Sequence, residues 1–215
     1  MTRLRSTLST SFLHQAVDLG HGQACLNLAE SALEISRKSA TPGAAALITV
    51  LKARGLAAER HAAQTTTTLQ RAETLLSRVA PGTEPSWINR IGFGEPSLAH
   101  QTALALRDLG DLAEAEHQFK RSRATRDGVG HPRTYSLTLA NLADVQFTRG
   151  LLPEACQNWS KSLDAMAGIR SARTDQAVRN LRSRLATLGP RKPTFAQQLN
   201  QHAAAWQQTT TSRPA

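Results

Sequence analysis

Residues that could do chemistry are scattered along the 215-residue chain rather than gathered in a motif. No two histidines stand four residues apart on a helix face with a third metal ligand nearby. The seven are His14, His21, His61, His100, His117, His131 and His202. The two cysteines, Cys25 and Cys156, also lack metal-ligand spacing, and their Ala-rich surroundings predict buried, reduced thiols. The sequence therefore predicts no metal site.

Two other stretches resemble functional motifs only in part. Gly92-Phe93-Gly94 has no preceding strand and no phosphate-binding lysine after it, so we predict a simple turn. The acidic "EAEH" at Glu114–His117 is typical of a helix start, where the helix dipole favours carboxylates. No nucleophile elbow is present to mark a Ser-His-Asp triad. We therefore predict a protein that is not an enzyme and that needs no cofactor.

The composition favours an all-helical fold. Hydrophobic residues make up 40% of the chain but aromatic residues only 4%, so the core must be built from Leu and Ala, which are strong helix formers. Few β-branched and aromatic residues are left to build a sheet. A chain of this length buries enough surface for one compact domain or one repeat array.

A 40-residue repeat runs through the chain. "LRDLGDLAEAEHQFKRSRA" from Leu106 matches "QFTRGLLPEACQNWSKSLDA" from Gln146, with Gly110 aligned to Gly150 and Phe119 to Trp159. A third copy has Gly20 as its turn, and a weaker fourth, from Ala53, lacks the turn glycine. Each copy predicts two helices joined by a tight turn, which must stack on neighbours to bury their apolar faces. Loops rich in Pro and Gly separate the pairs. We predict one helical-repeat domain over residues 1–206 and a disordered tail over residues 207–215.

The stretch "GIRSARTDQAVRNLRSRLATL", Gly168–Leu188, contains five arginines and one acid. The apolar residues Val178, Leu181, Leu185 and Leu188 recur every three or four positions, so we predict a closing helix that buries this stripe against the last repeat and Trp159. The alternative is nucleic-acid binding by the arginines around the stripe, because residues 168–215 carry +7 (8 − 1) of the net charge of +10. These are Arg173, Arg179, Arg182 and Arg184. We favour the closing helix, since a DNA-reading helix usually belongs to a compact three-helix unit.

"LGDLAEAEHQF" and "RGLLPEACQNW" resemble degenerate tetratricopeptide repeats. The order of features from Leu69 to His202 is similar to the C-terminal region of actinobacterial Xre-type helix-turn-helix transcriptional regulators. The resemblance implies an α-solenoid of about four helix pairs with a C-terminal capping helix, and a regulatory module that binds a peptide or protein. The family's helix-turn-helix has no counterpart in this sequence, so no DNA-binding residue is carried over. The chain is then a stand-alone module, a truncated regulator or a gene remnant, and a helix-turn-helix protein encoded nearby becomes a candidate partner.

In tetratricopeptide arrays the first helices of successive pairs line a concave groove. Mapping those positions onto this sequence predicts a partner-binding set that mixes apolar and charged groups, as a peptide or helix site would. Its members are Ser97, His100, Leu104, Arg107, Asp108, Asp144 and Phe147. The alternative is that some of them pack against a neighbouring first helix. A homodimer stays open. No apolar run approaches the ~20 residues of a membrane span, so we expect a cytoplasmic protein without a membrane partner.

Overall fold

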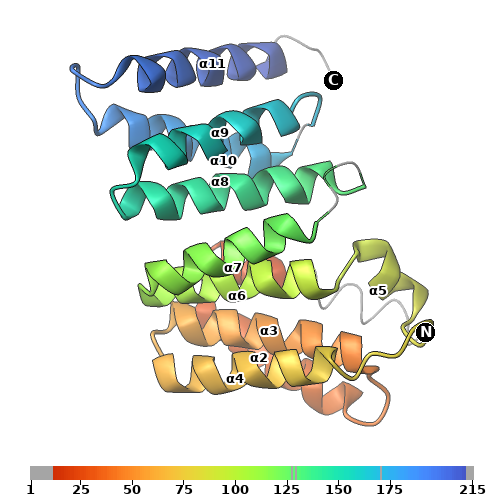
Figure 1. Cartoon of the computed structure of the whole chain (residues 1–215). Coiled ribbons are helices and arrows are strands. Elements are labelled where there is room, and N and C mark those ends of the chain that lie inside the picture. The colour runs from red at the N-terminus through yellow and green to blue at the C-terminus, as the bar shows by residue number, and fades with distance from the viewer. Residues whose placement is uncertain (1–11, 127, 129, 170, 212–215) are drawn as a thin grey trace. The chain divides into compact units, whose positions relative to one another are not determined.

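All regular elements in the described part of the chain are helices, as predicted. The computed structural model describes residues 12–126, 128, 130–169 and 171–211 (Figure 1). Residues 12–18 are helical. The helices that follow are α2 (Gly22–Ser36), α3 (Pro42–Ala58), α4 (Ala62–Leu76), α5 (Ser86–Ile91), α6 (Glu95–Leu109), α7 (Leu112–Ala124), α8 (Pro132–Thr148), α9 (Leu152–Ala165), α10 (Ala172–Ala186) and α11 (Thr194–Thr211).

The chain divides into two compact units, Met1–Ser122 and Arg123–Ala215, where the sequence predicted one domain over residues 1–206. The boundary falls near the end of α7. Helix α11 continues to Thr211, past the point at which we predicted that the disordered tail begins. The last four positions of that tail, and the N-terminal residues 1–11 that we assigned to a repeat, lie outside the described residues.

The first unit is built around α3. This helix is apolar on all sides, and 13 of its 17 residues are buried. It packs against α2, α4 and α6. Helix α7 is held on α6 by the buried Phe119 and by Ser122, whose hydroxyl donates to the Pro96 carbonyl at 2.6 Å. Apolar clusters around Leu51 and around Val50, on different faces of α3, form the core of this unit.

The second unit is organised around Trp159, whose side chain is 1% exposed. Val178, Leu181 and Leu185 of α10 belong to the same buried cluster, which confirms that the arginine-rich helix packs its apolar stripe onto the last repeat. One more helix follows, because α11 packs on both α9 and α10. It adds Trp206 and three smaller apolar side chains to the cluster.

A tight turn with a positive φ angle recurs at the 40-residue spacing of the repeats. Gly110 and Gly150 follow the first helix of their pairs with φ of 93° and 80°, in the left-handed region that glycine adopts at low cost. In the copy without a turn glycine, Arg60 occupies the equivalent place with φ 63°. The spacing from Gly20 to Arg60 equals that from Gly110 to Gly150. The short helix α5 lies between the first two repeat copies and the last two. The backbone turn is therefore retained where its glycine is missing.

Candidate functional site

Five of the seven predicted partner-binding residues lie on α6, in the first unit. Its side chains have different surroundings: Ser97 donates to the Gly92 carbonyl at 2.9 Å, and the His100 ring lies edge-on against Phe119 with centroids 5.4 Å apart. His100 and Leu104 are buried, so they contribute packing at this position. Gly92, Phe93 and Gly94 form the turn into α6 that the sequence predicted.

Arg107 and Asp108 pair with each other at the C-terminal end of α6. The guanidinium Nη2 of Arg107 lies 2.8 Å from Asp108 Oδ1, and both side chains are about one-third exposed. Whether the α6 set binds a partner stays a prediction.

A buried arginine that sequence analysis missed connects three helices of the first unit. Arg54 of α3 is 3% exposed, and its Nη1 lies 2.9 Å from Asp18 Oδ1 and 3.1 Å from Gln101 Oε1. The partners belong to the helical segment at residues 12–18 and to α6. The available signal was that α3 is apolar all round, since an arginine in such a helix must be buried and therefore paired.

The other two predicted partner-binding residues, Asp144 and Phe147, lie on α8 in the second unit. The Phe147 ring packs against Trp159 with centroids 5.5 Å apart, and the guanidinium carbon of Arg184 lies 5.7 Å from the centre of the same ring. The structure thus places one residue of the predicted partner groove beside one of the predicted nucleic-acid set. A cation over an aromatic face is worth roughly 0.5–1 kcal/mol at an exposed position.

The remaining arginines of the nucleic-acid set differ in their roles. Arg182 is partly buried and donates to the side-chain oxygen of Gln207, which ties α10 to α11. Arg179 is exposed and donates to Gln176 one turn earlier, at 2.8 Å. Arg173 and Arg184 are also exposed. Three of the four arginines therefore reach solvent, and nucleic-acid binding by them stays a prediction.

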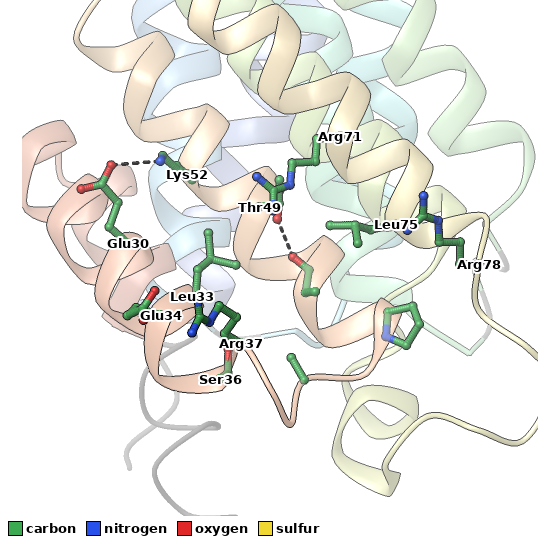
Figure 2. A pocket seen from close by; sticks show the side chains of 13 residues that line it. Glu30, Leu33, Glu34, Ser36, Arg37, Thr49, Lys52, Arg71, Leu75 and Arg78 are labelled. Carbon is green, nitrogen blue, oxygen red and sulfur yellow. Dashed lines mark hydrogen bonds and ion pairs between the residues drawn. The ribbon is translucent and has the colours of Figure 1, made fainter.

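The first unit also has a surface hollow of about 500 Å³ that sequence analysis did not find (Figure 2). Its floor is one face of α3, and its walls come from the C-terminal parts of α2 and α4 and from the residues that directly follow these helices. On this floor the Thr49 hydroxyl donates to the Ala45 carbonyl, 2.7 Å away. The residues lining this α2–α4 hollow are Glu30, Leu33, Glu34, Ser36, Arg37, Ala40, Pro42, Ala45, Thr49, Lys52, Arg71, Leu75 and Arg78.

The charges of the α2–α4 hollow are only partly compensated. Lys52 Nζ lies 2.9 Å from Glu30 Oε1 across the α2–α3 contact. Arg37, Arg71 and Arg78 are exposed, and none of their side chains has an ion-pair or hydrogen-bond partner within the described structure. Four cations and two carboxylates line the hollow, a balance of +2 (4 − 2). Its wall therefore offers guanidinium groups that are available to an anionic ligand.

The side chains most capable of catalysis are either dispersed or buried. Within the described ranges, no three His, Cys, Asp or Glu residues come together as metal ligands. Cys25 and Cys156 are buried, as predicted, and burial raises the pKa of each thiol to about 11. Because the thiolate is the nucleophile, neither sulfur is reactive near neutral pH. Across the described part of the chain, no helix is both long and apolar enough to span a bilayer.

No protein-family model and no curated protein matches the sequence. Among solved structures, the chain is similar to the "putative kinesin light chain nearly identical TPR-like repeats" of Podosopora anserina, with a TM-score of 0.60, 19% identity and 98% of each chain covered. A single-substitution variant of that protein gives a TM-score of 0.61 at the same 19% identity, over 98% of this chain and 97% of the other. The fold is TPR-like. At this identity the similarity concerns the fold alone.

In this TPR-like fold the two candidate surfaces lie on different kinds of helix. The predicted groove residues belong to α6 and α8, which are the first helices of their pairs. The α2–α4 hollow is walled by two second helices, with the first helix α3 as its floor. Mapping a repeat's groove positions onto the sequence considers first helices only, which is why it missed the hollow.

Proposed function

We propose that this protein is a non-enzymatic interaction module that binds a peptide or protein partner and acts in transcriptional regulation. The observation that supports the binding role is a TPR-like fold whose first unit has an open hollow lined by both apolar and unpaired charged side chains. Peptide sites combine these two features, since apolar contacts supply affinity and placed charges supply specificity.

Each unit also carries part of the groove set predicted from the sequence. Ser97, Arg107 and Asp108 on α6 of the first unit are partly exposed, and so are Asp144 and Phe147 on α8 of the second unit. His100 and Leu104 are buried on α6, which they hold in place. We assign contact with a partner to the partly exposed members and a supporting role to the buried ones.

The regulatory part of the proposal rests on the similarity of residues 69–202 to the C-terminal region of Xre-type regulators. That similarity makes a helix-turn-helix protein encoded nearby the first partner to examine. Such a partner would act in the cytoplasm, and this chain would change the DNA occupancy of its partner rather than contact DNA itself.

A binding screen tests the interaction role. The purified chain is applied to an array of short peptides with varied charge and hydrophobicity, and the retained peptides are measured in solution by isothermal titration calorimetry. Saturable binding to a defined subset is expected. Absence of binding to every peptide, together with turnover in a broad substrate panel, would contradict the proposal.

The regulatory role needs a separate experiment. The helix-turn-helix protein encoded nearest to this chain is purified, and its affinity for its own operator is measured with and without the present chain. We expect the chain to change that affinity. An unchanged affinity, with no complex detected by analytical ultracentrifugation, would leave a binding module without this regulatory task.

A further inference from the structure

We propose that the α2–α4 hollow binds an acidic peptide segment in which two carboxylates flank an apolar side chain. This inference rests on the proposed function, because it names the partner class of an interaction module. It adds the site, the charge of the ligand and the residues that select it.

The α4 wall sets the spacing. Arg71 and Arg78 are seven positions apart, and Leu75 stands between them, one turn from each (Figure 2). Arg71 belongs to α4 and Arg78 lies in the turn just after its last residue, Leu76, so the two guanidinium groups come from either end of this wall. Leu75 is only partly buried and adds apolar surface between the charges. A ligand matching this wall carries two anionic groups with an apolar group between them.

The guanidinium groups need no rearrangement to accept a ligand. Neither the Arg71 nor the Arg78 side chain forms an ion pair or hydrogen bond within the described structure, and the same holds for the side chain of Arg37 just after α2. Lys52, by contrast, is already engaged with Glu30 at 2.9 Å. A planar guanidinium offers two parallel N–H donors to a carboxylate, which favours this group as the recognised anion.

The opposite wall argues against a nucleic acid as the ligand. Glu30 and Glu34 project from α2 on the other side of the floor (Figure 2). A continuous polyanion laid along the hollow would approach these two carboxylates, whereas a peptide can turn its acids to α4 and an apolar or basic side chain to α2. The charge pattern therefore fits a peptide better than a phosphate backbone.

The probe for this inference is a fluorescein-labelled peptide with two glutamates and a leucine at the same spacing as Arg71, Leu75 and Arg78. Its affinity for the full chain is measured by fluorescence anisotropy. Companion probes are the same peptide with glutamines, the same peptide with lysines, and a single-stranded oligothymidylate. We expect the glutamate peptide to bind, and the glutamine peptide to bind at least about tenfold more weakly.

Variants of the wall localise the binding. Arg71→Gln and Arg78→Gln should each weaken binding of the glutamate peptide about three- to tenfold, while Arg90→Gln on α5, an exposed arginine away from the hollow, should leave it unchanged. The charge-reversed double variant Arg71→Glu/Arg78→Glu should lose the glutamate peptide and gain the lysine peptide. Circular dichroism checks that each variant keeps its helical content.

Three results would overturn the inference. They are no binding of the glutamate peptide at millimolar concentration, equal losses for Arg90→Gln and the wall variants, and a larger loss of oligothymidylate affinity than of glutamate-peptide affinity in the wall variants. The first two leave the proposed interaction role intact if the wider peptide array yields another ligand. The third would make the hollow a polyanion site. Failure of the inference and failure of the proposed function are thus separable.

Discussion

At the scale of single residues, the burial of a charged side chain determines how much its ion pair contributes to stability. Arg54 and Lys52 are two residues apart on α3, and each pairs with one carboxylate. The Arg54 side chain is 4% exposed, whereas the Lys52–Glu30 pair has side-chain exposures of 27% and 60%. An enclosed cation that loses its partner remains desolvated, while an exposed one is rehydrated by water.

This contrast gives a quantitative prediction. Asp18→Ala should lower the free energy of unfolding by about 2–4 kcal/mol, because it leaves the Arg54 charge buried without its carboxylate. Glu30→Ala should cost at most about 1 kcal/mol. Urea unfolding followed by circular dichroism measures both, and a double-mutant cycle with Arg54→Ala isolates the pair. Equal costs for the two substitutions would mean that Arg54 is not held by Asp18.

At the scale of elements, the tight turn is the most regular feature of the repeats. Gly150 and Arg60 occupy the same place after α8 and α3, and both have positive φ. A Cβ added at Gly150 would meet no atom within 4 Å, so any cost of a side chain there is a cost of backbone conformation. Arg60 is exposed, and its side chain has no hydrogen-bond or ion-pair partner in the described structure.

Exchanging side chains at these two turns should have opposite effects. Gly150→Ala should lower the free energy of unfolding by about 1 kcal/mol, because alanine is disfavoured in the left-handed region. Arg60→Gly should raise it by up to about 1 kcal/mol, since the strain disappears and no contact is lost. Thermal unfolding of the two variants and the parent is the measurement. A destabilised Arg60→Gly variant would show that Arg60 forms a contact absent from this structure.

In the second unit, Trp159 is the residue that holds several helices together. It is buried among α9, α10 and α11 residues, in one cluster with Val178, Leu185 and Trp206. Trp159→Ala should cost roughly 3–5 kcal/mol, because the large side chain leaves a cavity. Hydrogen exchange should quicken in α9, α10 and α11, while α3 in the first unit keeps its protection. Unchanged protection of α10 would show that this helix does not depend on Trp159 and would favour the nucleic-acid alternative.

At the scale of the whole molecule, the charge is unevenly distributed along the sequence. Residues 168–215 carry +7 (8 − 1) of the net charge of +10. Within this segment, Arg173, Arg179 and Arg184 of α10 are exposed, while Arg182 is engaged by Gln207. A few exposed arginines suffice for weak, non-specific attraction to nucleic acid, but they do not provide the base contacts that sequence recognition needs.

We therefore expect duplex DNA to bind this chain weakly at low salt and to be released near physiological ionic strength. The triple variant Arg173→Gln/Arg179→Gln/Arg184→Gln should flatten the dependence of log affinity on log salt by at most about 3 units of slope, since each neutralised phosphate contributes about 0.9. Gel-shift titrations at several salt concentrations provide the measurement. Salt-resistant binding to one sequence would instead make nucleic-acid recognition the principal function.

Features set by local periodicity could be predicted from the sequence by itself. The Leu- and Ala-rich repeats specified helices, and Gly110 and Gly150 marked their turns. The three- and four-residue spacing of Val178, Leu181 and Leu185 identified the face of α10 that is buried. These features depend on residues within a few helical turns of one another, so the pattern of one segment is sufficient.

Only the tertiary structure decided which distant residues meet. Arg54 joins partners at positions 18 and 101, and Arg184 lies over Phe147 on another helix. The α2–α4 hollow is formed by two helices, α2 and α4, that both pack on α3. Helical periodicity fixes the face on which a side chain lies but not the helix that this face will meet, because that depends on how all the helices of a unit pack together. The candidate site is built from such long-range contacts, which is why it had no local signature.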